Sequence, residues 1–357
     1  MMGAVDIMKG REYFKSVKVL FDHPNAFLLA HGGLQTQIEQ TKKALEYSGL
    51  EVEWLRWWDD KQKGDLIHYF GRAHPGYIRQ AQGKGIKVVM SELLTGLGSR
   101  KTGARMAQKM IMGLARGFLP REFTARLCWD SYKLADTSIA LTSWEKRLMV
   151  EMFSAEPNRV HIVPNGVEEI FFGNQESKIQ TQTSKYLVCT ATITERKRVV
   201  ELAEAAILAQ VPVWVIGDPY SKREPYYKKF VSVVESSKGL VKYEGGISDR
   251  AKMATIYKSA SGFVLFSSME SLSLSALEAA AGKCPLLLAD LPWARSTFGD
   301  GATYCRLGPG KQESRALKDF YKSIDKAPRA PVPCRWSEVG AQLKQIYESL
   351  LADKTSR

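Results

Sequence analysis

Two glutamates, Glu270 and Glu278, stand eight positions apart around the junction of an apolar run and an amphipathic segment. The run that ends near Phe266 predicts a strand, and the segment 273–281 predicts a helix. The first backbone N–H groups of a helix have no partner within the helix, so they form a cradle for phosphate. Here these groups belong to Leu272, Ser273 and Leu274. We expect Glu270 at the mouth of this cradle.

The helical period determines where the second carboxylate points. Glu278 falls on the same stripe as Leu274 and Leu277, so its side chain faces the apolar side of the helix. An unpaired carboxylate there is costly. Two explanations stay open: an arginine or backbone donors satisfy Glu278 in the core while Glu270 is only a helix-terminal charge, or both carboxylates belong to a binding site.

A basic triplet and a glycine pair add groups that suit an anionic ligand. The triplet Arg-Lys-Arg at 196–198 follows the apolar run 186–189, and Gly32 and Gly33 precede a helical pattern. Glycine lets the backbone approach a ligand closely, because it has no side chain. The simpler interpretations are a solvated start of a helix for the triplet and an ordinary turn for the glycines.

These features, in this order, resemble the retaining GT-B glycosyltransferases of family four, which carry a Glu-x7-Glu motif. The stretch 266–285 matches that motif, with Glu270 and Glu278 at its two glutamate positions. Four further segments match landmarks of the family in the family's order. They are Gly32-Gly33-Leu34, Ile162–Val167, Val215–Asp218 and Tyr243–Ile247. The resemblance extends over almost the entire chain.

The resemblance implies a substrate and a role for each matched residue. The donor is a UDP-, GDP- or ADP-sugar, and Lys197 with Arg196 binds its diphosphate. Glu278 accepts hydrogen bonds from the ribose, and Glu270 contacts hydroxyls of the donor sugar. The remaining donor-binding positions are Gly32, Gly33, Leu272, Ser273 and Leu274 at the phosphates, and Gly246 and Ile247 at the base. The candidate catalytic residues are Glu270, Lys197 and His68.

The chain departs from the family pattern at two positions. Thr192 stands where the family usually has an arginine, and Arg196 or Arg198 would have to compensate. Phe70 stands where many members place a histidine beside the donor sugar, and His68 lies two residues earlier on the same face of a strand. His68 is either a site residue or a core histidine.

The elements that must position these residues follow from the alternation of apolar runs with helical patterns, which is typical of a mostly parallel α/β sheet. We expect a GT-B fold with two Rossmann-like domains facing across a cleft, and a C-terminal helix that crosses back to the first domain. The domain boundaries are 1–173 for the acceptor side, 174–184 for a linker, 185–335 for the nucleotide-sugar domain and 336–357 for the closing helix.

Composition and charge limit the partners. The 357 residues carry a net charge of +13, which favours an anionic partner, but no nucleic-acid motif is present. Five scattered cysteines, a start without an apolar leader and the lack of a membrane-spanning run predict a cytosolic protein. No D-x-D motif or metal-ligand spacing of histidines occurs, so we expect no metal and no cofactor.

One helix concentrates the basic charge. Between Arg100 and Arg121 there are six basic residues and no acidic ones. Arg105, Lys109 and Arg116 share one face of the predicted helix, and an apolar row that includes Met110 and Leu114 shares the opposite face. Such a helix either docks on the anionic cytoplasmic face of a membrane or covers the domain core with its apolar face.

The sequence therefore predicts a retaining hexosyltransferase that moves a sugar from a nucleotide-sugar donor to an unknown acceptor. A lipid-linked or polysaccharide precursor and a small soluble metabolite are both candidate acceptors. Two other functions stay open, namely a non-catalytic nucleotide-sugar-binding relative and a GT-B-fold nucleotide-sugar epimerase.

Overall fold

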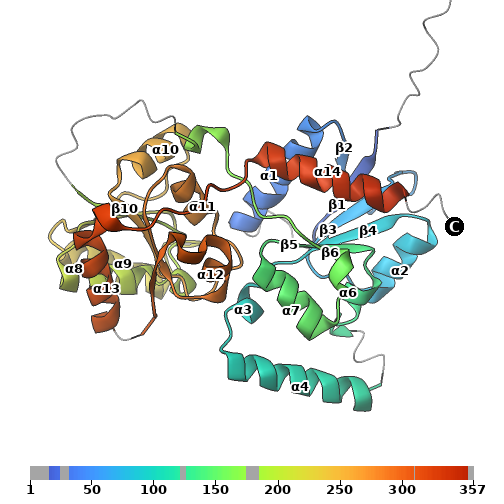
Figure 1. The fold of residues 1–357 in the computed structure, drawn as a ribbon, viewed down its shortest axis with the longest axis horizontal. Helices are drawn as coiled ribbons and strands as arrows, with labels where there is room; N and C mark the ends of the chain where they lie inside the picture. The colour runs from blue at the N-terminus through green and yellow to red at the C-terminus, as the bar shows by residue number, and fades with distance from the viewer. Residues whose placement is uncertain (1–15, 25–31, 121–125, 174–184, 309, 353–357) are drawn as a thin grey trace, which may run out of the picture.

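The computed structural model describes residues 16–24, 32–120, 126–173, 185–308 and 310–352 (Figure 1). Two parallel sheets of six strands each lie side by side, and helices cover their faces. This confirms the expected α/β fold class. The predicted linker, 174–184, lies outside the described residues.

The N-terminal sheet has the order β2-β1-β3-β4-β5-β6, and every neighbouring pair is parallel. Its strands are β1 (Lys18–Asp22), β2 (Glu51–Trp54), β3 (Leu66–Phe70), β4 (Lys87–Ser91), β5 (Thr137–Ala140) and β6 (Val160–Ile162). Its helices are α1 (Gly33–Tyr47), α2 (Pro75–Gly83), α3 (Thr95–Gly98), α4 (Thr102–Phe118), α6 (Ser131–Leu134) and α7 (Ser143–Phe153), and its 3-10 turns are η2 (Pro157–Arg159) and η3 (Glu169–Phe171).

The C-terminal sheet has the order β12-β11-β10-β7-β8-β9 and is also parallel. Its strands are β7 (Leu187–Thr190), β8 (Val213–Ile216), β9 (Val241–Tyr243), β10 (Gly262–Leu265), β11 (Leu286–Ala289) and β12 (Thr303–Cys305). Its helices are α8 (Val199–Ala209), α9 (Pro225–Ser236), α10 (Arg250–Ser259), α11 (Leu274–Ala281), α12 (Pro292–Phe298) and α13 (Gly310–Lys322), with 3-10 turns η4 (Glu195–Lys197), η5 (Gly299–Gly301) and η6 (Ile324–Lys326).

The central strands show why apolar runs predict this fold. Strands β10 and β11 are buried at every position, as expected where helices cover both faces of a parallel sheet. Such strands appear in the sequence as nearly continuous apolar stretches rather than as alternating ones. The carboxyl end of β10 leads into the loop that carries Glu270 to Ser273, which line the candidate site.

The closing helix α14 (Trp336–Ala352) crosses back to the N-terminal domain and packs against α1 (Figure 1). The approach is close at Gly340, where an added Cβ would lie 2.4 Å from the carbonyl oxygen of Ala44. Lys344 also donates a hydrogen bond to the carbonyl of Ser48 at 2.9 Å. The helix therefore ties the end of the chain to the first domain.

Helix α4 does not cover the core. Its apolar row faces outward, and of its side chains only Met112 is buried. Of the two alternatives for this helix, the one in which its apolar face packs on the domain core is therefore wrong. Among the described residues, no helix combines the length and the apolar character that a membrane span requires.

Candidate functional site

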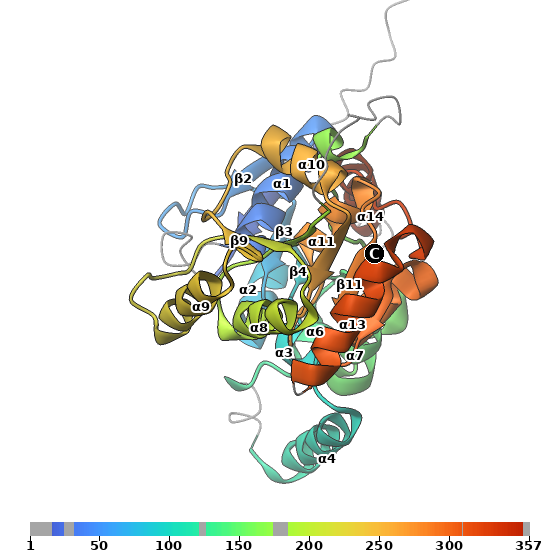
Figure 2. The ribbon, with the colours of Figure 1, turned by 90° about the vertical axis from the view of Figure 1, so that its left-hand side faces the viewer.

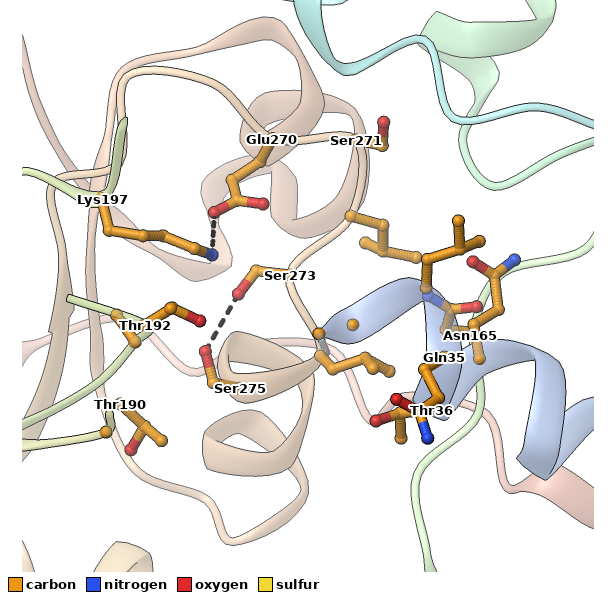
Figure 3. Close-up of a pocket in the computed structure, with 18 of the residues that line it drawn as sticks. Gln35, Thr36, Asn165, Thr190, Thr192, Lys197, Glu270, Ser271, Ser273 and Ser275 are labelled. Carbon is orange, nitrogen blue, oxygen red and sulfur yellow. Dashed lines mark hydrogen bonds and ion pairs between the residues drawn. The ribbon is translucent and has the colours of Figure 1, made fainter. Parts of the chain in front are cut away.

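A pocket of about 660 Å³ lies between the two domains and is lined by both (Figure 3). Its walls come from the loops that follow the carboxyl ends of strands in each sheet, which is where open α/β sheets bind their ligands. The N-terminal domain contributes residues after β1, β4, β5 and β6, and the C-terminal domain contributes residues after β7, β8, β9 and β10.

Two helices begin at this pocket, one from each domain. Helix α1 begins at Gly33 after an N-cap glycine that offers no side chain, and α11 begins at Leu274 after Ser273, which accepts a hydrogen bond from the amide of Ala276. The first turns, Gly-Leu-Gln-Thr and Leu-Ser-Ala-Leu, are uncharged. A Cβ on Gly33 would lie 3.8 Å from Leu274, so the two helix starts are close neighbours. Their dipoles together favour an anion in the pocket.

The first glutamate of the motif is held by two cations. Lys197 donates a hydrogen bond to one carboxylate oxygen of Glu270 (Figure 3). The guanidinium of Arg196 lies 3.3 Å from the other carboxylate oxygen. Arg196 is itself held in place by a 2.6 Å hydrogen bond to the carbonyl of Met269. Glu270 is buried, yet it lines the pocket together with both cations. The site therefore has two positive side chains around one negative one.

The second glutamate of the motif has an arginine partner. Arg250 at the start of α10 bonds Glu278, and Tyr257 donates a hydrogen bond to the other carboxylate oxygen at 3.3 Å. Arg250 also pairs with Glu168, which precedes η3 and comes from the first half of the chain. Burial raises the pKa of Glu278, while Arg250 and Tyr257 oppose that rise. Glu278 therefore fits both explanations left open by the sequence. An arginine satisfies its carboxylate, and the same carboxylate lines the pocket.

The pocket brings together most of the predicted donor-binding residues. Those that line it are Gly32, Gly33, Arg196, Lys197, Glu270, Leu272, Ser273, Leu274 and Glu278. The other two, Gly246 and Ile247, line an adjoining hollow of about 380 Å³, which shares Glu278 and Gly217 with the first. The two hollows therefore adjoin along residues that line both of them.

The glycines of the site differ in what requires them. A Cβ on Gly246 would lie 2.1 Å from Asp218, whose carboxylate accepts a hydrogen bond from the Gly246 amide at 3.0 Å. At Gly32 and Gly33 a Cβ would meet only ordinary contacts, at 4.0 Å and 3.8 Å. A side chain at position 246 would therefore displace the Asp218 carboxylate, whereas at Gly33 the protein itself leaves room for a methyl group.

His68 lies outside the main pocket. It is buried in the core of the N-terminal domain, where its two ring nitrogens bond Ser91 and Tyr347 at 2.6 Å each. Its ring stacks on Phe70, with 4.1 Å between the centroids. Burial lowers the pKa of His68 to about 3. The structure thus places the candidate catalytic histidine among core residues beneath α14. Its contact with Tyr347 of that helix spans 279 positions, so sequence spacing does not predict it.

Arg198 does not compensate for the missing arginine at position 192. Its guanidinium donates a 2.6 Å hydrogen bond to Glu313, which is fully buried on α13. The residue is not among those that line the pocket, whereas Thr192 and Arg196 are. Of the two expected substitutes, only Arg196 reaches the site.

Several pocket residues carry no sequence assignment. Arg250 is the partner of Glu278, and Asn165 belongs to a segment that the resemblance matches without a role for this side chain. Gln37 lines the pocket with a buried Oε1 atom that has no hydrogen-bond partner among the described residues. Because an unpaired charge at Glu278 is costly, the sequence indicates that this carboxylate has a partner. It does not indicate which arginine that partner is.

Within the described residues, no group of three or more His, Cys, Asp or Glu side chains is placed to hold a metal ion. All five cysteines are free thiols.

No protein-family profile matches the sequence, and no curated protein matches it. Solved structures do, and together with the two parallel sheets around a shared pocket they define a GT-B fold. A sucrose-phosphate synthase from Thermosynechococcus elongatus superposes with a TM-score of 0.70 at 16% identity, covering 95% of this chain and 100% of that one.

Two further structures give the same fold. HepE from Anabaena in complex with UDP-glucose has a TM-score of 0.62 at 15% identity over 95% of this chain and 100% of that one. The lipopolysaccharide outer core galactosyltransferase WaaB, in its apo form, has a TM-score of 0.57 at 14% identity over 95% and 98%.

Proposed function

We propose that this protein is a retaining glycosyltransferase that moves a hexose from a nucleotide-sugar donor to an acceptor. The observation that carries the proposal is the convergence of two helix N-termini, Lys197 and Arg196 on one pocket between the domains. A diphosphate is the group that best matches this arrangement, because it offers several anionic oxygens to N–H donors from both sides.

The diphosphate is bound by groups from both domains. The amides at the start of α1 approach it from the N-terminal domain, and those of residues 272–274 approach it from the C-terminal domain. Lys197 has three N–H donors, so it reaches a phosphate oxygen while it keeps its bond to Glu270. Arg196 adds a second cation.

The rest of the donor extends along the two adjoining hollows in the C-terminal domain. Glu278 accepts hydrogen bonds from the ribose hydroxyls, and Arg250 and Tyr257 fix the carboxylate for that purpose. The hollow at Gly246 and Ile247 takes the base. Glu270, at the opposite end, contacts hydroxyls of the sugar.

Transfer requires opposite charges to be stabilised at two points. Negative charge grows on the departing diphosphate, where the cations and amides lie, and positive charge grows at the anomeric carbon. The Glu270 carboxylate, held by Lys197, lies at the sugar end and favours that positive charge. The cations and amides already provide positive charge for the diphosphate, so we propose that the reaction needs no metal ion.

The acceptor enters on the N-terminal side, where the lining residues Gln35, Thr36 and Asn165 face the donor wall (Figure 3). We propose a lipid-linked or polysaccharide precursor as its class. In this proposal the protein works in the cytoplasm, at the surface of the membrane.

Hydrolysis of the donor tests the proposal without knowledge of the acceptor. UDP-, GDP- and ADP-sugars are incubated with the protein, and proton NMR follows the release of nucleoside diphosphate and the anomer of the freed sugar. The proposal expects one donor class to turn over, with the sugar first released in the anomeric configuration that it had in the donor, in the presence or absence of EDTA. Turnover to an epimer with no release of nucleotide, binding without any turnover, or activity that EDTA abolishes and Mg²⁺ or Mn²⁺ restores would contradict it.

A further inference from the structure

Helix α4 carries an apolar face that no other part of the described chain covers. In both views the helix lies at the outer edge of the N-terminal domain (Figures 1 and 2). Five large side chains on one side of it are mostly exposed to solvent. They are Met106 (68%), Met110 (64%), Ile111 (60%), Leu114 (54%) and Phe118 (84%). An amphipathic helix that only served the core would have the opposite orientation.

The orientation is fixed by contacts on the other side of the helix. The guanidinium of Arg105 lies 4.5 Å from the ring centre of Trp144, and that of Arg116 lies 5.8 Å from the ring centre of Trp129. Arg116 also donates a hydrogen bond to the carbonyl of Trp129 at 3.4 Å. Together with buried Met112, these cation–π contacts hold the apolar row outward.

An exposed apolar face of this kind marks an interaction surface. The charge around it indicates the partner. Residues 100–120 include five basic side chains and no acidic one, and the exposed Lys109 lies at the edge of the apolar row. A second copy of the chain would bring two such basic segments together, whereas an anionic lipid surface attracts them and also accepts the apolar side chains.

We propose that the apolar face of α4 inserts into the interfacial layer of an anionic bilayer. This inference rests on the proposed function and deepens it, because it places the N-terminal domain, which forms the acceptor side, at a membrane. It differs from docking through Arg105 and Arg116, since the tryptophans hold those residues on the domain side. Insertion depends on the methionines, Leu114 and Phe118, and Lys109 adds attraction to lipid headgroups.

Vesicle flotation tests the inference independently of transfer. The full chain is mixed with vesicles of phosphatidylcholine and phosphatidylglycerol at 3:1, and in parallel with phosphatidylcholine alone. We compare the wild type with Met110→Asp/Leu114→Asp and with the uncharged variant Met110→Gln/Leu114→Gln. The matched control is Leu208→Asp/Val332→Asp, which places the same charge at apolar residues exposed to 60% and 72% elsewhere on the surface.

The wild type and the control should float with the anionic vesicles, and both α4 variants should partition at least tenfold less. All four proteins should bind the nucleoside diphosphate equally, because these residues lie outside the pocket. Three results would overturn the inference: a wild type that does not float, α4 variants that float like it, or a concentration-dependent dimer that the α4 variants abolish. If flotation fails while nucleotide binding persists, only this inference is lost; if flotation holds and no nucleotide binds, the proposed function fails instead.

Discussion

Helix α11 in the C-terminal domain buries a carboxylate, whereas helix α4 in the N-terminal domain exposes a row of apolar side chains. A buried carboxylate without a partner is unfavourable, and so is a row of apolar side chains exposed to water. The carboxylate of Glu278 is compensated inside the protein by Arg250 and Tyr257. The apolar row of α4 has no such compensation within the described chain. The difference is that Glu278 has its partners within the protein, whereas the apolar row of α4 is the basis of the membrane contact proposed above.

The largest effect is expected at the pocket cation. Replacing Lys197 with Ala removes a charged hydrogen-bond donor from the diphosphate and from Glu270. The loss is about 2–3 kcal/mol, or roughly 30- to 150-fold in kcat/KM for donor hydrolysis. Lys318→Ala, an exposed lysine on α13, should leave kcat/KM unchanged. Equal values of kcat/KM for the two variants would show that Lys197 does not bind the diphosphate.

The buried His68 should affect the stability of the fold. Its pKa of about 3 means that the folded state keeps the ring neutral while the unfolded chain protonates it near the ordinary value of 6.5. Stability is therefore lost as the pH falls below that ordinary value, by about 2 kcal/mol between pH 7 and pH 5. Urea unfolding at both pH values should show this loss in the wild type and not in His68→Gln.

The same histidine should have no part in donor binding. Because both ring nitrogens are occupied by Ser91 and Tyr347, His68→Gln should bind nucleoside diphosphate at pH 7 as the wild type does. If His68→Gln folds but binds the nucleotide several-fold more weakly, then His68 does contribute to donor binding.

Glu278 should make nucleotide affinity depend on pH. Burial raises its pKa, and the ribose hydroxyls require the ionised form, so affinity should fall as the pH drops through this raised value. The sign for stability is opposite: the neutral form suits the folded state, so stability falls as the pH rises over the same range. Calorimetry across pH should show the decline in the wild type, and a flat profile with about tenfold weaker binding at high pH in Glu278→Gln. A variant with the wild-type profile would assign the pH dependence to another group.

The smallest effect concerns the start of α1. At Gly33 the protein leaves room for a methyl group, so Gly33→Ala should keep or slightly raise the melting temperature. The methyl group would nevertheless keep a phosphate from the helix start and weaken binding several-fold, by about 1 kcal/mol. Gly83→Ala, at an open position on α2, is the control and should not change affinity. Unchanged affinity in both variants would place the anion elsewhere in the pocket.

Sequence patterns predicted some parts of this molecule better than others, for physical reasons. The strands follow from apolar runs, because a parallel sheet covered on both faces buries nearly every residue, as in β10 and β11. The ion pair between Glu313 on α13 and Arg198, which lies 115 positions earlier, does not follow from any local pattern. Apolar periodicity marks the face of α13 that buries Leu317 and Phe320, but it does not show which cation meets Glu313.

At the site and at α4, the sequence likewise does not predict which distant residues come into contact. Motif spacing placed Glu270 and Glu278 near one pocket, but the partners Arg250 and Glu168 depend on how distant segments meet. For α4, periodicity separates two faces without showing which one contacts the domain. That choice is made by Trp144 and Trp129, which hold the arginines.

The central claim is that the pocket between the domains binds the diphosphate of a nucleotide. Titration calorimetry of the wild type and Lys197→Ala with UDP, GDP and ADP tests it most directly. One of the three nucleotides should bind the wild type at a single site, and its affinity for the variant should be at least tenfold lower. If none of the three binds the wild type, or if both proteins bind equally, the pocket does not hold a diphosphate through Lys197.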